Sequence, residues 1–149
     1  MNWNDLLTSR RLERHTTSSA ELNALREAVA RDLKDAELAG LTHDRQFAIT
    51  YNAVFLLGKM VLACAGYRAL APAHHQTTFD ALPLAMGAAE KTRARYFQTC
   101  RRKRNIVDYD SASGASETEA AELLAAADSF RDDVERWIAS SFPEYAPPR

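Results

Sequence analysis

The segment from Thr42 to Gly66 constrains the fold of this chain more than any other. Its apolar residues recur at helical spacing and cover most of the circumference of the helix that they predict: Phe47, Tyr51, Val54, Phe55, Gly58, Val61, Leu62 and Ala65. A helix that is hydrophobic nearly all round is normally the central one of a bundle, or it buries its second face against another subunit. Either arrangement makes this segment the core of the protein.

Amphipathic helices are predicted on both sides of this segment. Ser18 and Glu21 form a capping-box pattern that starts one helix, which Gly40 ends. Ser116 opens a second capping box, Ser-Glu-Thr-Glu, and the helix that follows runs to about residue 140. The apolar positions at spacings of three and four are Leu22, Leu25, Val29, Leu33 and Ala36 in the first helix, and Ala120, Leu123, Ala127, Phe130, Val134, Trp137 and Ile138 in the second.

The remaining stretch predicts two further helices and no strand. Residues 71–80 read as a loop that leads into a short helix, with Thr77 or Thr78 as its N-cap and Pro83 limiting its length. A fourth long segment, from about Ala88 to Tyr109, is also expected to be helical. No run of four to eight residues shows the alternation of a strand.

These elements predict one all-α domain in a chain of 149 residues. We expect an up-and-down bundle of four to five helices over residues 18–140, preceded by a segment, 1–17, that can form a short helix, and followed by an irregular tail, 141–149. The most apolar stretch, Ala53–Ala65, is shorter than the ~20 residues that cross a bilayer, and the chain starts without a signal-peptide pattern. Cys64 and Cys100 have no metal-ligand spacing. We therefore expect a cytoplasmic protein with no membrane partner, metal or cofactor.

The charges are separated along the chain although they nearly cancel, with a formal net charge of −1. Seven basic residues and no acid lie between Lys91 and Arg104, whereas nine acids and one base lie between Asn105 and Glu135. One interpretation is that the fourth and fifth predicted helices neutralise each other as neighbours. The other is that the basic helix binds an anion.

The helical phase of one arginine favours the second interpretation. Arg104 lies on the same stripe as Cys100 and Val107, where a charge is costly unless it meets a carboxylate or a phosphate. Along one edge of the same helix, Asn105 and Tyr109 follow a further arginine, Arg102. Guanidinium, amide and phenol donors in one groove suit a phosphodiester.

The sequence Arg-Arg-Lys-Arg-Asn-Ile-Val-Asp-Tyr-Asp, residues 101–110, resembles the motif of the HEPN superfamily, which is Arg, often Asn, three further residues, then His. Arg104 and Asn105 match the first two positions, and Tyr109 stands where the histidine would be. The order of the predicted helices over about residues 18–140 is also similar to that family. The resemblance implies a homodimer in which two motifs face each other across a cleft. It further implies RNA as the target, metal-independent cleavage in toxin–antitoxin or phage-defence systems, and a minimal nucleotidyltransferase as partner.

The resemblance also implies roles for individual residues. Arg104 would stabilise charge on the phosphate, and Asn105 would orient the phosphate or hold the motif helix. Three neighbours would bind the RNA backbone: Arg101, Arg102 and Lys103. Tyr109 is a poor general base because the pKa of a tyrosine is near 10. We therefore expect a weak nuclease, a nuclease with another base, or a protein that binds without cutting. His74 and His75 would supply that base if their loop folds over the motif; otherwise they belong to a polar loop or a helix cap.

Two alternatives to RNA chemistry stay open. In the first, the protein is an inactive interaction module that binds a partner such as a nucleotidyltransferase, and Arg104 is a structural ion-pair residue. In the second, it is an enzyme that acts on a small substrate, and only the histidine pair supports this alternative. His15 and His43 are expected to be surface or cap residues.

Overall fold

The computed structural model describes the backbone of residues 1–109 and 114–148, and the side chains of residues 1–105 and 114–148. The elements are α1 (Trp3–Thr8), β1 (Leu12–Arg14), α2 (Ser19–Asp35), α3 (His43–Ala65), β2 (Tyr67–Ala69), α4 (His74–Met86), the 3-10 helix η1 (Ala88–Glu90), α5 (Lys91–Tyr109), α6 (Glu117–Ser141) and the 3-10 helix η3 (Pro143–Tyr145). The prediction of an all-α helical bundle is confirmed.

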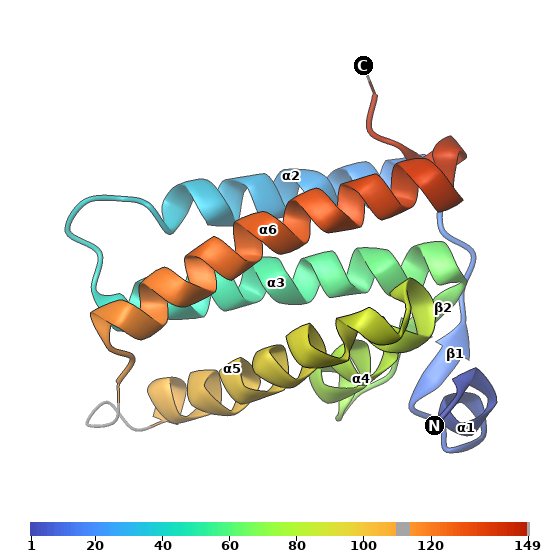
Figure 1. Ribbon diagram of the computed structural model, residues 1–149, viewed down its shortest axis with the longest axis horizontal. Helices are drawn as coiled ribbons and strands as arrows, with labels where there is room; N and C mark the ends of the chain where they lie inside the picture. The colour runs from blue at the N-terminus through green and yellow to red at the C-terminus, as the bar shows by residue number, and fades with distance from the viewer. Residues whose placement is uncertain (110–113, 149) are drawn as a thin grey trace.

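Helix α3 is the centre of the bundle, as its all-round hydrophobicity predicts. It packs against α2 and α6 on one side and against α4 and α5 on the other (Figure 1). By length and composition the helix could also cross a membrane, but most of it is buried inside the protein, as in the core helix of a soluble bundle. This apolar helix therefore lies mostly inside the protein.

The helix starts that rest on capping residues are confirmed. Ser18, Thr42 and Ser116 each accept a hydrogen bond from a backbone N–H of the first turn, at 3.1, 3.3 and 3.1 Å. The capping box is complete at Ser116, where the Glu119 carboxylate accepts from the Ser116 N–H at 2.9 Å. At Ser18 the carboxylate of Glu21 instead binds His15 at 2.9 Å.

Two predicted helix boundaries are wrong. Helix α2 ends at Asp35, before Gly40, because the chain turns at Ala36. Helix α4 begins at His74, not at Thr77 or Thr78, and continues past Pro83 to Met86. Both threonines are buried inside α4, and the Thr78 hydroxyl donates to the His74 carbonyl at 2.7 Å. The earlier start places both histidines in the first turn of a helix.

The prediction that the chain has no strand is also wrong. Strands β1 and β2 pair antiparallel, with Glu13 opposite Arg68, and are too short for any alternation to show in the sequence. Together with α1 they cover a small second core, which consists of Leu6, Leu12, Leu62 and Ala81. The tail, predicted to be irregular, contains η3. Its Tyr145 carbonyl accepts from Arg26 at 2.6 Å, which holds the tail on α2.

Candidate functional site

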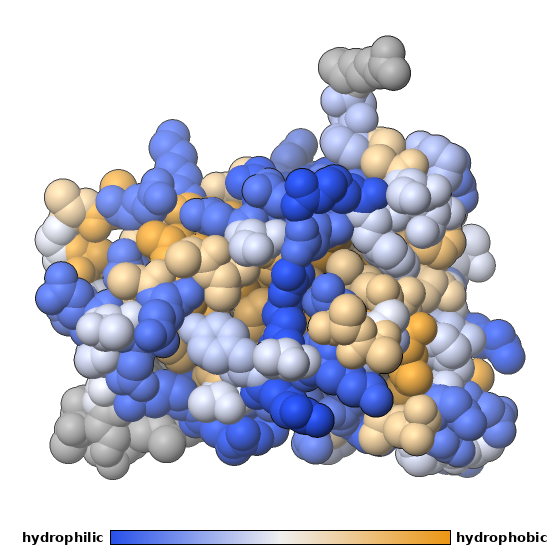
Figure 2. Space-filling view, in the orientation of Figure 1, coloured by the Kyte–Doolittle hydropathy of each residue, from blue (hydrophilic) through white to orange (hydrophobic). Residues whose placement is uncertain are grey.

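The basic residues of α5 divide between two faces of the helix. On the face toward α6, Arg93 forms an ion pair with Asp133, and Lys103 lies 3.6 Å from Glu119. The Arg93 guanidinium also lies 5.3 Å from the centre of the Phe130 ring. Figure 2 shows that the surface over α5 and α6 is mostly hydrophilic, with hydrophobic atoms visible between the polar side chains. On this face the two charged helices neutralise each other.

The other face of α5 meets the start of α4 at a small cavity of about 180 Å³. Helix α5 contributes Arg101, Arg104 and Asn105 to its lining. The segment at the start of α4 contributes Pro72, Ala73, His75 and Gln76. We call this the His75 cavity. It combines two guanidinium groups, two amides and an imidazole in one opening, which are groups that donate hydrogen bonds to an anion.

Side-chain contacts fix α5 against α4 beside this cavity. The Gln98 amide donates to the Gln76 carbonyl and to Asp80 Oδ1, both at 3.0 Å. Its oxygen in turn accepts from Arg101 Nε at 2.8 Å. The hydrogen bonds on Gln98 therefore hold Arg101 against α4, so that its guanidinium is oriented before any ligand arrives.

The ring of His75 is held by aromatic side chains of α3. It stacks on Phe55 with ring centroids 3.8 Å apart, and its Nδ1 lies 2.8 Å from the hydroxyl of Tyr51. The Arg104 guanidinium lies over the Tyr51 ring in a cation–π contact, 5.7 Å from the ring centre. Tyr51 thus touches both the histidine and the arginine of the cavity.

Burial lowers the pKa of His75 to about 4, and the positive groups of His74, Arg104 and Arg101 lower it further. Burial raises the pKa of the Tyr51 phenol, which stays protonated. At neutral pH the His75 ring is therefore uncharged. Both groups are satisfied when the Tyr51 O–H donates to Nδ1, which leaves the ring proton on Nε2 and makes Nε2 a donor for a ligand.

The start of α4 adds to the positive potential of the cavity. Ala73 occupies the N-cap position, and no side chain caps the helix. The N–H groups of a first turn carry a partial positive charge, and α4 directs this charge toward the end where His75 and Gln76 lie. Together with Arg101 and Arg104, this makes the opening strongly attractive to an anion.

The predicted site residues do not all meet at this cavity. Arg101, Arg104, Asn105 and His75 line it together, so the start of α4 lies beside α5 at this cavity. Arg102 is exposed and lies 3.4 Å from the Thr99 hydroxyl of its own helix, and Lys103 is on the α6 face. The side chain of Tyr109 lies outside the described residues.

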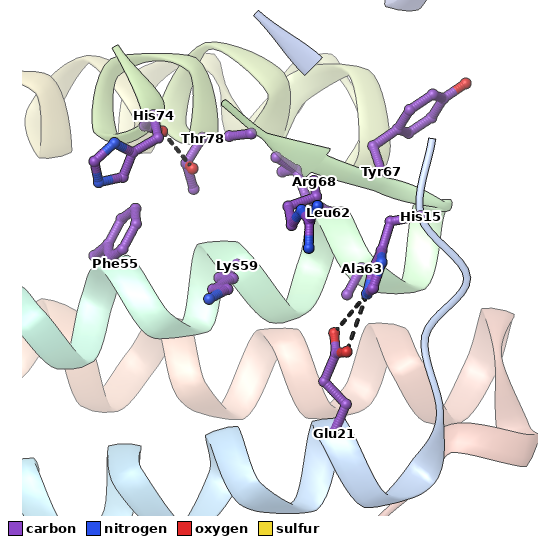
Figure 3. Close-up of a pocket in the computed structure, with 11 residues that line it drawn as sticks. His15, Glu21, Phe55, Lys59, Leu62, Ala63, Tyr67, Arg68, His74 and Thr78 are labelled. Carbon is purple, nitrogen blue, oxygen red and sulfur yellow. Dashed lines mark hydrogen bonds and ion pairs between the residues drawn. The ribbon is translucent and has the colours of Figure 1, made fainter. Parts of the chain in front are cut away.

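His74 contacts the ring of its neighbour His75 edge-on, with ring centroids 4.6 Å apart, but lines a different cavity. Its ring packs edge-on against Phe55 and lines a second cavity, between α3 and α4, together with His15 and Glu21 (Figure 3). Sequence reasoning treated His15 as a surface or cap residue and Tyr51 as core. The spacing of Tyr51 and Phe55, four residues apart on one face of α3, is the signal that could have paired them with the histidines.

The chemistry available at the His75 cavity is anion binding and proton transfer. In the part of the chain that the structure describes, no group of three or more His, Cys, Asp or Glu side chains is placed to hold a metal ion. Comparison with known proteins gives no match among family models, curated proteins or solved structures. The function must therefore be inferred from the chemistry of the site itself.

Proposed function

We propose that this protein binds RNA through its backbone phosphates at the His75 cavity. The observation that carries the proposal is the convergence of Arg101, Arg104 and His75 from two helices on one opening. Arginine binds phosphate oxygens in pairs, and an uncharged imidazole and an amide add neutral donors. The volume of about 180 Å³ suits a phosphate group and leaves the rest of a bound strand outside the cavity.

The same geometry supports slow cleavage of the bound strand without a metal. In this reaction the 2′-oxygen forms a bond to the adjacent phosphorus while the bond to the 5′-oxygen breaks, and a proton must leave the 2′-hydroxyl and another must reach the 5′-oxygen. His75 is our candidate for the base. To act as the base it would have to exchange the tautomer that donates from Nε2 for the one whose Nδ1–H donates to the Tyr51 hydroxyl, so that Nε2 accepts the proton of the 2′-hydroxyl, while water supplies the proton of the 5′-oxygen.

Electrostatics couples binding to this step. In the free protein the low pKa of His75 makes it a weak base. A bound phosphate offsets the positive charge of Arg101 and Arg104, two of the groups that lower this pKa, and therefore raises it. The two guanidinium groups also stabilise the charge that develops on the phosphate oxygens.

The proposal includes the wider context that the resemblance of residues 101–110 implies. The protein would be a HEPN-like homodimer in the cytoplasm, in a toxin–antitoxin or phage-defence system with a nucleotidyltransferase as partner. Tyr109 would then assist in binding and not serve as the base, because His75 is already beside Arg104.

Two double variants that remove the same charge from α5 test the binding step. We expect Arg101→Gln with Arg104→Gln to weaken the affinity for a fluorescent single-stranded RNA by a factor of about 100, measured by anisotropy, because two charge-assisted contacts are lost. Lys91→Gln with Arg95→Gln, at exposed positions away from the cavity, is the matched control and should cost less than about fivefold. Equal losses in the two variants would refute the site.

The salt dependence of binding separates RNA binding from the interaction-module alternative. The wild-type affinity for RNA should fall steeply as the salt concentration rises from 50 to 200 mM, because binding releases the counterions of about three phosphates. An absence of RNA affinity at every salt concentration would favour the interaction module.

The cleavage step is tested by His75→Gln, which should keep RNA binding within about threefold and abolish strand scission on a denaturing gel. Scission that survives this change would show that His75 is not the base.

A further inference from the structure

A second groove lies on the opposite side of the two histidines from the His75 cavity. It opens between α3 and α4 and is bounded by β2 and by the start of α2 (Figure 3). Its inner part, of about 190 Å³, has an apolar floor of Phe55, Leu62 and Ala63. A neighbouring hollow of about 300 Å³ continues it toward α2. The residues that line both parts are His15, Glu21, Lys59 and Arg68.

Three of these four polar side chains are already engaged within the protein. The carboxylate of Glu21 accepts hydrogen bonds from His15 at 2.9 Å and from the Thr17 hydroxyl at 3.2 Å. Arg68 forms an ion pair with Glu13 on the neighbouring strand. Lys59, in contrast, has no carboxylate partner among the described side chains, and it stands on α3 between Phe55 and Leu62.

We infer that this groove binds a small aromatic carboxylate. An apolar cavity of about 150 Å³ holds benzene, so the inner part has room for one substituted ring. The ring would lie on Phe55, Leu62 and Ala63, and the carboxylate would meet the ammonium of Lys59, with Arg68 also lining the groove. The apolar floor and the cation at its edge together define this class of ligand.

Two side chains that line the groove, His74 and Phe55, have rings in contact with His75. Phe55 lines the groove, and its ring stacks directly on His75. A ligand that contacts Phe55 therefore changes the ring-current environment of His75. The imidazole resonances of His75 should report binding even when no RNA is present, so this inference does not rest on the proposed function.

The test uses phenylacetate as the probe and the whole chain in free solution. We expect saturable shifts in heteronuclear NMR spectra at Phe55, Lys59 and His75, and weaker binding of the neutral analogue phenylacetamide by roughly five- to tenfold. Lys59→Met should weaken phenylacetate binding by a similar factor and leave phenylacetamide unaffected. Lys59 is exposed, so this variant keeps the fold.

Two controls locate the site. Lys34→Met, which removes an exposed lysine at the end of α2, should leave phenylacetate binding unchanged. The variant with Arg101→Gln and Arg104→Gln should also keep it, which distinguishes this groove from the phosphate site. Equal affinity for phenylacetate and phenylacetamide, shifts confined to the His75 cavity, or no binding at millimolar probe would each overturn the inference.

Discussion

Helix α5 shows two faces that carry the same kind of side chain in different surroundings. On one face Lys103 meets Glu119, and Arg93 meets Asp133, so the acids of α6 cancel the basic charge. On the other face Arg101 donates to Gln98, the Arg104 guanidinium lies over the Tyr51 ring, and both arginines line a cavity with the uncharged ring of His75. The net charge of a whole helix therefore says little about its ligands, whereas the net charge of each face identifies where an anion can bind.

Charge reversal on each face gives the largest expected difference. We expect Arg101→Glu to weaken RNA affinity by roughly 30- to 100-fold, because it removes a phosphate contact and adds repulsion. Lys103→Glu changes the net charge by the same amount, yet it should cost less than about threefold, since Lys103 faces α6. Anisotropy measured with one RNA at one salt concentration checks both. A similar loss in the two variants would mean that binding follows net charge and that the two faces do not differ.

The position of α4 can be disturbed from the core side. A Cβ atom at Gly58 would lie 2.5 Å from Thr78 Cγ2, so α3 and α4 cannot keep their spacing in Gly58→Ala. We expect a loss of about 1–3 kcal/mol in the free energy of unfolding, measured in urea, together with slower strand scission as His75 moves away from α5. Adding Thr78→Ser removes the clashing methyl group and should restore much of both. If Thr78→Ser restores neither property, the close approach of α3 and α4 is not the cause of the two losses.

The uncharged state of His75 predicts a pH dependence of stability. Its pKa is about 4 in the folded protein, below the ordinary value of 6.5, so the unfolded chain binds more protons between these values. Stability should therefore be greatest above pH 6.5 and should fall as the pH drops toward 4, by about 1–2 kcal/mol once solvent screening is included. His75→Gln should flatten the curve of unfolding free energy between pH 6.5 and 5. A curve of unchanged slope would contradict the uncharged ring.

The smallest expected effect belongs to the neutralised face. Glu119→Gln weakens the contact with Lys103 but keeps a side chain that can accept from the Ser116 N–H, so the unfolding free energy should fall by only about 0.5 kcal/mol. RNA affinity should stay within about twofold. Glu122→Gln, one turn further along α6, is the matched control. A large gain in RNA affinity for Glu119→Gln alone would show that α6 shields Lys103 from the nucleic acid.

Local signals made most of the bundle predictable from the sequence. Ser18, Thr42 and Ser116 are good N-cap residues, and each starts a helix where the pattern placed it. The start of α4 was missed because Thr77 and Thr78 are also good caps in isolation. The Thr77 hydroxyl instead accepts from Arg11 at 3.0 Å, and the Thr78 hydroxyl donates to the His74 carbonyl of its own helix. Propensity alone could not anticipate a partner 66 residues away.

The candidate site was predictable in part for the same reason. The stripe of α5 places Arg101, Arg104 and Asn105 within one helical face, which follows from spacing alone. The contact of Tyr51 with His75 joins α3 to α4 and depends on how the two helices pack, which no local pattern specifies. The sequence analysis singled out Arg104 and Asn105 by spacing but placed Arg102, not Arg101, in the same groove as Asn105, and only packing could bring the histidine to them.

The N-terminal segment has a consequence for how the protein opens. Arg11 binds Asp80 of α4 at 2.6 Å across 69 residues of chain, and β1 pairs with β2 just before α4 begins. Contacts between such distant segments form a cooperative unit that is held by few bonds and opens before the bundle core. In hydrogen-exchange terms, α1, β1 and the first turn of α4 would exchange together. The lifetime of the His75 cavity would then be set by how long the first residues of the chain stay in place.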